Sequence, residues 1–346
     1  NSAQMKNAVL LTVFTNTVIS LSVIAQRVTP GPIPVQSSTI VDGPAGIIPE
    51  NVPTKRMIPY EYVREADVIW SKRVWQFIDL REKINHPLYF PMDELTPYGT
   101  WLRNSTHWSL WTIIRTHVLN GDLRVFSPYD PLSFGFGTKD GYDFKYPIDP
   151  PPGGSFYSDS AFRSDLIWYL GYLGPEGDIP FVDEYGDPLV TINEFGDSSF
   201  VYPPRDTIWY TSKDIVQYHL KEDWFFDKER SVLDVRIMGI APVVYDIEED
   251  ANGSKTIRGM KELFWLYFPH CRYIFNNYFV YNDHNDAQWM SFDDLFWKRR
   301  FNAVIYKESN TYDRTIDAYR SGVEALYEDQ EIKNEIRNIE QDVWSF

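Results

Sequence analysis

A β-hairpin pattern in the second half of the chain constrains the fold more than any other feature. Leu-Asp-Val-Arg-Ile at 233–237 alternates apolar and charged side chains, as a strand with two different faces does. Asn252-Gly253 is typical of a tight hairpin turn, and a second strand-like run follows at 257–268. The sequence therefore predicts antiparallel strands here.

Helical patterns surround this hairpin. Apolar residues recur at spacings of three, four or seven over 61–85, which predicts a helix that ends at Pro87. A second helix is predicted around 101–119. Thr211-x-x-Asp214 resembles a capping box that opens a helix through Leu220, and Ser291-x-x-Asp294 begins another. A C-terminal helix is predicted from the apolar stripe of Ile332, Ile336, Ile339 and Val343.

These patterns predict an α+β protein, in which antiparallel β-hairpins pack with amphipathic helices around a loop-rich middle insertion. Residues 127–210 are rich in Gly, Pro, Asp and Tyr, with short strand-like runs such as 189–192. The predicted segments are a signal peptide (1–25), a Pro-rich extended arm or disordered linker (26–59), an N-terminal helical and β segment (60–137), the insertion (138–210) and a C-terminal α+β segment with a terminal helix (211–346).

The N-terminus has the pattern of a secretory signal. Lys6 precedes an apolar run that ends at Ala25, so we expect cleavage near Ala25–Gln26; the alternative is a buried N-terminal helix. With no cysteine at that point, we expect no lipid attachment there. Cys271 is the only cysteine, so the fold has no internal disulfide and depends on its core. The mature protein is predicted to be soluble and exported.

A cassette of apolar residues and Trp followed by a Lys-Arg pair occurs twice, at 66–75 and 293–301, both within predicted helices. Lys and Arg stems lie along apolar surface while their heads stay in water, which favours protein contact over chemistry. The alternative is ordinary core packing with a solvated basic edge, above all for Trp70 and Trp297. The candidate interaction residues are Trp70, Lys72, Arg73, Trp75, Trp297, Lys298, Arg299 and Arg300.

No catalytic, metal or cofactor pattern is found in the sequence. The formal charge of −16 excludes a general nucleic-acid role, because phosphate binding needs a basic surface. The six histidines lack metal-ligand spacing, Gly-x-Ser-x-Gly is absent, and 135–141 is a turn rather than a phosphate loop. A Cys271–His270 dyad is disfavoured because neighbours on a strand face opposite ways, so Cys271 is expected to be buried and structural. The run at 282–286 lacks calcium-loop spacing.

Aromatic residues leave one alternative class open. The chain has 12 Trp, 23 Tyr and 22 Phe beside abundant carboxylates, a composition compatible with an exported carbohydrate-binding protein or glycoside hydrolase. Since no acid pair is singled out, this is the second choice.

Several long runs resemble one known family. Residues 214–243, 261–269 and 292–301 look like the GldN/PorN family of gliding-motility and type IX secretion ring proteins. The first cassette, within 64–89, and Lys-Glu-Ser-Asn-Thr-Tyr-Asp-Arg at 307–314 are similar to the same family. The likeness covers most of 60–344.

The resemblance implies a periplasmic, non-enzymatic ring protein at the inner face of the outer membrane. It further implies self-association in a ring, a lipoprotein partner (GldK/PorK), contact with the periplasmic part of the motor (GldM/PorM), and no cofactor. The chain would then reach the membrane only through its partners.

Overall fold

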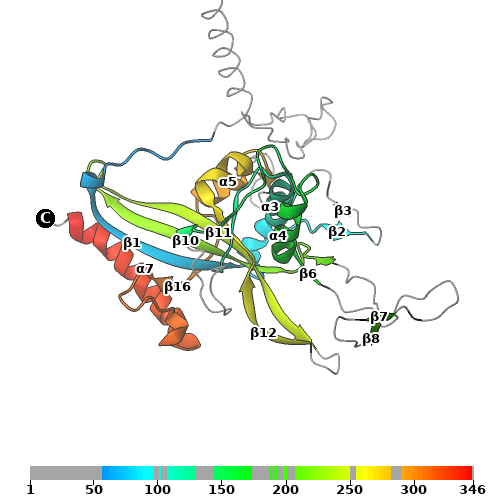
Figure 1. Ribbon diagram of the computed structural model, residues 1–346. Coiled ribbons are helices and arrows are strands. Elements are labelled where there is room, and N and C mark those ends of the chain that lie inside the picture. Colours follow the sequence, from blue (N-terminus) through cyan, green and yellow to red (C-terminus); the bar gives the residue numbers. More distant parts are fainter. Residues whose placement is uncertain are drawn as a thin grey trace, which may run out of the picture.

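The computed structural model describes residues 57–96, 101–102, 104, 107–129, 143–173, 188, 190–192, 198–200, 207–249, 255–281 and 290–344 (Figure 1). The predicted signal peptide and residues 26–56 of the predicted arm lie outside this set. Among the described residues no helix has the length and apolar character needed to cross a membrane.

An antiparallel sheet of eight strands forms the body of the protein (Figure 1). Its three long strands are β1 (Val68–Asp79), β10 (Ile215–Asp227) and β11 (Val232–Glu249), and β1 pairs with β10, which pairs with β11. The short strand β16 (Val304–Glu308) pairs with β1 at one edge. Beyond β11 the order continues with β13 (Trp265–Tyr267), β4 (Val125–Phe126) and β5 (Pro147–Ile148).

The predicted hairpin is confirmed. Residues 233–237 lie in β11, whose far end pairs antiparallel with β12 (Lys255–Glu262). The Asn252-Gly253 turn itself lies outside the described residues. The described residues also form four smaller two-stranded sheets. They pair β2 (Glu94–Leu95) with β3 (Trp101–Leu102), β6 (Gly171–Leu173) with β9 (Thr207–Trp209), β7 (Val190–Ile192) with β8 (Ser198–Phe200), and β14 (Phe279–Val280) with β15 (Met290–Ser291).

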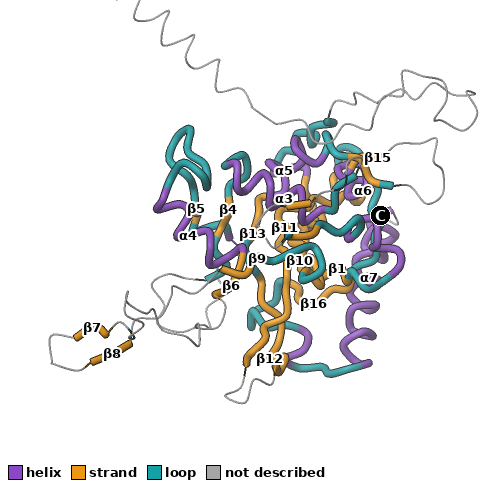
Figure 2. Tube along the Cα trace, turned by 90° about the vertical axis from the view of Figure 1, so that its right-hand side faces the viewer, coloured by secondary structure: helices purple, strands orange, loops and turns teal. Residues whose placement is uncertain are grey.

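The helices gather at two places. α3 (Leu110–Asn120), α4 (Ser160–Leu170) and α5 (Phe268–Phe275) group near one end of the long strands, whereas α7 (Val323–Trp344) runs beside β1 and β16 (Figures 1 and 2). Shorter helices are α2 (His86–Tyr89), α6 (Phe292–Trp297), and the 3-10 turns at Glu65–Asp67, Lys83–Asn85 and Ile316–Ala318. The expected α+β class is confirmed.

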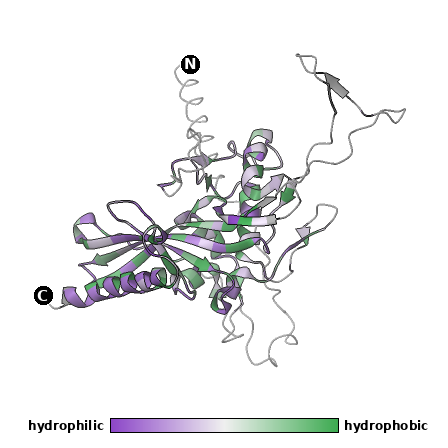
Figure 3. Ribbon diagram, turned by 90° about the horizontal axis from the view of Figure 1, so that it is seen from below, coloured by the Kyte–Doolittle hydropathy of each residue, from purple (hydrophilic) through white to green (hydrophobic). Residues whose placement is uncertain are grey.

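Both groups of helices pack on the same face of the sheet. Along β1, side chains two residues apart share a face. Val74 belongs to the cluster that holds Ile332 and Ile336 of α7, while Ile78 belongs to the larger core that holds α3 to α6. Ile332 and Ile336 are buried, as the C-terminal stripe predicts, and most other residues of α7 are hydrophilic (Figure 3).

The opposite face has a smaller aromatic cluster. It contains Trp75, Phe126, Ala241 and Trp265, all from strands, with Phe144 packed against them. None of the residues assigned to this cluster comes from a described helix. An antiparallel sheet can face water on one side, and we call this side, whose cluster contains no residue of a described helix, the open face.

The helix predicted over 61–85 is wrong, since most of the first cassette lies in strand β1. A spacing of four, as between Trp70, Val74 and Ile78, puts side chains on one face of a helix and equally on one face of a strand. The β-branched and aromatic content of 68–78 favours the strand, and pairing on both sides with β10 and β16 fixes it.

The helix predicted from Thr211 to Leu220 is also wrong, because β10 begins at Ile215. The Asp214 carboxylate accepts bonds from the backbone and hydroxyl of Thr211, at 2.7 and 2.8 Å, and so closes a turn. By contrast, two predicted helix ends are confirmed: Gly121 ends α3 in the left-handed region, and Ser291 caps α6 by accepting from the backbone N–H of Asp294. The helix predicted around 101–119 begins only at Leu110, since residues 101–102 form β3. α4 adds a helix to a segment where only loops and short strands were predicted.

Candidate functional site

The first cassette divides between the two faces of β1. Trp70 is half-buried against the α7 cluster on the helix-covered face. Lys72 lies on the same side, where its ammonium contacts Glu308 of β16 at 2.8 Å and Glu335 of α7 at 2.9 Å. Burial opposes the charge of Lys72, but the bonds to both carboxylates outweigh it and raise the pKa of this lysine. These two residues therefore fasten α7 to the sheet.

Arg73 and Trp75 point to the open face. The Arg73 guanidinium donates two hydrogen bonds to Asp223 of β10, at 2.5 and 2.7 Å. Trp75 is 6% exposed and lies in the aromatic cluster. The ammonium groups of Lys307 and Lys221 lie 4.7 and 6.0 Å from the centre of its ring.

A groove of about 720 Å³ extends over this face from β1 to β11. We call it the basic groove. Its lining on this face includes three cationic and three acidic side chains, together with Trp75 and the apolar residues Val63, Val68, Phe225 and Met238 (the charged residues are Arg73, Arg236, Lys307, Asp143, Asp223 and Asp313). Lys72 also borders the groove, but its ammonium lies on the helix-covered face with Glu308 and Glu335.

The second cassette begins in α6, but its basic residues follow the helix. α6 ends at Trp297, Lys298 is its C-cap, and Arg299 adopts a left-handed backbone with φ of +50°. The first turn of α6 is acidic, with Asp293 and Asp294. The prediction that all three basic residues lie on the helix is therefore wrong.

Trp297 is 48% exposed and takes part in a stack. Its ring stacks on Tyr60 at 5.7 Å, and the Arg272 guanidinium contacts both rings, 4.3 Å from Tyr60 and 4.8 Å from Trp297. Asp293 holds Arg272 in place through two bonds of 2.7 and 3.0 Å. The stack anchors the chain segment that leads into β1, because Arg272 also binds the carbonyl oxygen of Ile58.

The two cassettes meet at Glu222, which is fully buried. Glu222 pairs with Val74 of the first cassette across β1 and β10, and its Oε1 accepts a 2.8 Å bond from Arg299 of the second. Its Oε2 accepts bonds from Gln76 at 2.8 Å and from Trp224 at 3.1 Å. A buried carboxylate needs such donors, so Arg299 is part of the fold. Sequence spacing gives no sign of this contact between residues 77 positions apart.

Lys298 and Arg300 differ from the other cassette residues. Both are exposed, and no described residue forms an ion pair with either side chain. With half-exposed Trp297 beside them, they form what we call the α6 edge (Trp297, Lys298 and Arg300).

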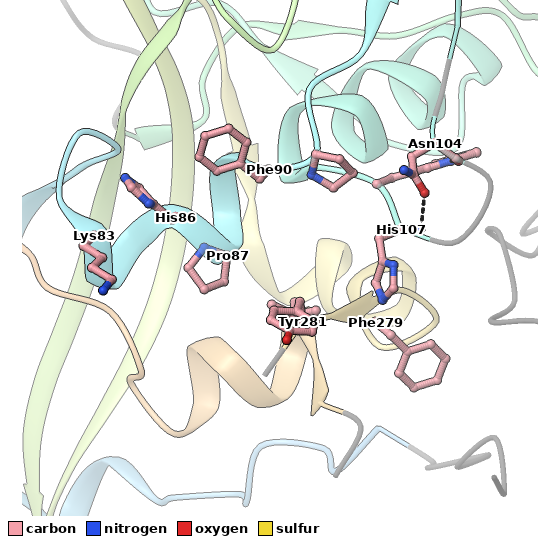
Figure 4. Close-up of a pocket in the computed structure, with 11 residues that line it drawn as sticks. Lys83, His86, Pro87, Phe90, Asn104, His107, Phe279 and Tyr281 are labelled. Atoms are coloured by element: carbon pink, nitrogen blue, oxygen red, sulfur yellow. Dashed lines mark hydrogen bonds between the residues drawn. The ribbon is translucent and has the colours of Figure 1, made fainter. Parts of the chain in front are cut away.

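A second cavity of about 350 Å³ lies between α2, the residues before α3, and β14 (Figure 4). Aromatic and imidazole rings line it, from His86, Phe90, His107, Trp108 and Tyr281 among others. Burial lowers the pKa of His107. The described lining contains no Asp or Glu, whereas glycoside hydrolysis uses two carboxylates.

Two histidines have carboxylate partners elsewhere. His117 contacts Asp122 and the Tyr278 hydroxyl, each at 2.7 Å, but its side chain is fully buried in the core. His219 contacts Glu262 at 2.8 Å beneath the open face. Among the described residues, neither imidazole forms a hydrogen bond with a serine or a cysteine.

Cys271 was expected to be buried and structural, and the structure confirms its burial. It lies on helix α5 rather than on a strand, where its thiol donates to the carbonyl oxygen of Tyr267. Burial raises the pKa of this thiol well above its usual range. Within the described part of the chain, no three His, Cys, Asp or Glu side chains group as metal ligands. The runs at 135–141 and 282–286 lie outside that part.

The fold and these sites define an α+β protein whose conspicuous aromatic and basic residues mostly serve packing and ion pairs. The family model described as "Gliding motility associated protein GldN" matches residues 63–345, which is most of the chain. The chain belongs to this family, whose members are structural components of the gliding motility and type IX secretion machinery. The resemblance of the sequence runs is thereby confirmed. No curated protein matches the chain.

Proposed function

We propose that this protein is a non-enzymatic periplasmic ring subunit of the type IX secretion and gliding motility machinery. It associates with further copies of itself, assembles with an outer-membrane lipoprotein of the GldK/PorK type, and contacts the periplasmic part of a GldM/PorM-type motor protein. The family match over 63–345 is the observation that carries this proposal.

The arrangement of the cassettes supports a role in contact rather than chemistry. Six of the eight candidate residues have contacts within the chain: Trp70 and Trp75 in packing, Lys72, Arg73 and Arg299 in ion pairs, and Trp297 in its stack with Tyr60 and Arg272. Lys298, Arg300 and the exposed half of Trp297, which form the α6 edge, are left for a partner. An exposed Trp flanked by two cations without ion pairs among the described residues is the composition of an interface anchor.

The proposal is tested by affinity purification of the tagged full chain from detergent-solubilised membranes, followed by electron microscopy. We expect a ring-shaped particle that contains this chain and a lipoprotein. A monomer that instead binds or cleaves polysaccharide would favour the alternative, an exported carbohydrate-binding protein or glycoside hydrolase.

The α6 edge is tested by Lys298→Glu combined with Arg300→Glu. Since neither side chain has an ion pair in the described structure, we expect the fold to be retained and ring recovery to fall at least tenfold. Lys213→Glu with Lys228→Glu is the matched control, because both lysines are exposed and the change in charge is the same. Equal recovery of both variants would remove the α6 edge from the interface.

A further inference from the structure

Cationic side chains outnumber acidic ones around the basic groove, although the protein as a whole is acidic. On the open face its lining holds Arg73, Arg236 and Lys307 against three aspartates, while the whole chain has a formal charge of −16. Lys221 adds a fourth cation beside it, since its ammonium pairs with Asp143 and faces the ring of Trp75. The groove therefore has a small positive excess within an acidic protein.

Two of these cations are buried beneath acids that are themselves exposed. Lys307 pairs with Asp313 at 2.6 Å, and Lys221 pairs with Asp143 at 3.2 Å. The lysine side chains are 5% and 4% exposed, whereas the two aspartates are 81% and 54% exposed. Burial, together with the charge of Arg73, lowers the pKa of Lys221. The aspartates therefore reach the lysines from the solvent side, as carboxylates of a bound molecule also can.

Arg236 is a cation of the groove that forms no ion pair with a described carboxylate. Its Nε is buried and has no hydrogen-bond acceptor among the described residues. Its Nη2 donates to the carbonyl oxygen of Glu61, and its guanidinium lies 5.0 Å from the ring of Phe225. Because Arg236 is only partly buried and has no described carboxylate partner, an incoming carboxylate would gain a charge-assisted hydrogen bond there.

The shape of the groove distinguishes among anionic ligands. Its lining follows β1 from Val68 to Trp75, which at the rise of a strand is about 23 Å. A single phosphate or carboxylate fills a small part of that length, whereas an extended peptide of about seven residues matches it. The apolar lining of Trp75, Phe225 and Met238 gives such a peptide a place for an apolar side chain.

We propose that the basic groove binds an extended acidic segment of a partner protein, with carboxylates at Arg236 and Lys307 and an apolar side chain against Trp75. This inference rests on the proposed function for the existence of such a partner. It names the chemistry that the partner presents, and a surface distinct from the α6 edge.

The test uses the purified full chain and a fluorescein-labelled peptide of nine residues, Asp-Glu-Leu-Asp-Phe-Glu-Asp-Leu-Glu, with binding followed by anisotropy. The matched control peptide carries Asn and Gln in place of each Asp and Glu. We expect the acidic peptide to bind and the neutral one not to bind. Affinity should fall about tenfold between 50 and 300 mM NaCl, because salt screens charges near a surface.

Variants locate the binding. Arg236→Gln should weaken binding about tenfold, the loss expected for one charge-assisted hydrogen bond, while Lys298→Gln should change it less than twofold. Because Arg236 also holds Glu61, a second pair of variants avoids any effect on folding. Ser71 and Ser309 are exposed and line the groove, so Ser71→Trp and Ser309→Trp should each obstruct the peptide.

Three results would overturn the inference. They are equal binding of the neutral peptide, unchanged binding in both Trp variants, and full displacement of the peptide by 10 mM inorganic phosphate, which would indicate a small-anion site.

Recovery of the ring distinguishes a failure of the groove proposal from a failure of the proposed function. A ring that forms normally while the peptide does not bind contradicts the groove alone, and peptide binding without any ring contradicts the proposed function alone.

Discussion

The contact between Arg299 and Glu222 gives a quantitative prediction about stability. In Arg299→Ala, the Glu222 carboxylate stays fully buried but loses the cation that neutralises it. Breaking a buried ion pair by removing one partner costs about 3–5 kcal/mol. Gln76 and Trp224 still donate to Glu222, and Arg299 is 29% exposed, so water reaches the site in part. We therefore expect a loss of about 2–3 kcal/mol in the free energy of unfolding, at or just below the lower limit of that range.

The backbone of Arg299 allows a sharper comparison. Its φ of +50° is left-handed, a conformation that costs a residue with a Cβ roughly 1–2 kcal/mol and costs glycine almost nothing. Arg299→Gly loses the same ion pair but relieves this strain, so it should be more stable than Arg299→Ala by about 1 kcal/mol. Adding Glu222→Gln to Arg299→Ala removes the unpaired charge and should recover part of the loss.

Urea unfolding of the full chain, followed by tryptophan fluorescence, measures all these variants. Lys298→Ala is the matched control, because the adjacent lysine is exposed; it should stay within about 0.5 kcal/mol of the parent. The reasoning is refuted if Arg299→Ala is no more destabilising than this control. It is equally refuted if the effects of Glu222→Gln and Arg299→Ala are additive within about 0.3 kcal/mol, since contacting residues should couple.

Three further predictions concern the core. Asp93→Asn leaves fully buried Arg115 without its 2.6 Å partner and should cost about 3 kcal/mol or more, measured by urea unfolding. Burial alone would raise the pKa of Asp93, but Arg115 and the bonds from Ser212 lower it overall. The stabilisation that this carboxylate contributes is therefore complete above about pH 4 and is lost as pH falls through the lowered pKa. The difference in unfolding free energy between parent and variant should accordingly disappear in acid. Gly121→Ala places a Cβ 2.8 Å from the carbonyl oxygen of Gly154 at φ +80°, and should cost about 2 kcal/mol or more, seen as a lower Tm; an unchanged Tm would contradict it. Cys271 should react with iodoacetamide only on the timescale of unfolding, and rapid labelling of the native protein would show that its burial is incomplete.

Local signals predicted elements correctly where the turn chemistry is specific. Asn252-Gly253 correctly placed β11 against β12, Ser291 capped α6, and Gly121 ended α3. The two helix caps depend on hydrogen bonds or backbone angles within a few residues, and an Asn-Gly pair favours a tight turn for an equally local reason.

Periodicity failed at the first cassette for a physical reason. Spacings of two and four coincide on a strand, and a spacing of four also suits a helix, so Trp70, Val74 and Ile78 do not discriminate. The segment forms a strand because β10 and β16 pair with β1 on its two edges. Since β10 lies far away in sequence, the spacing within the cassette does not reveal this pairing. A missed strand in turn misplaced the candidate contacts, since alternate residues of the cassette lie on opposite faces of the sheet.

The sequence by itself determined the α+β class, the core stripe of α7, the hairpin and the membership of the GldN family, because these follow from local patterns and long specific runs. Only the tertiary structure decided which cassette residues are accessible. Glu222 draws Arg299 into the fold, Glu308 and Glu335 hold Lys72, and Lys298 and Arg300 are left exposed. Burial and ion pairing join residues up to 263 positions apart, and no spacing within a cassette encodes such a contact.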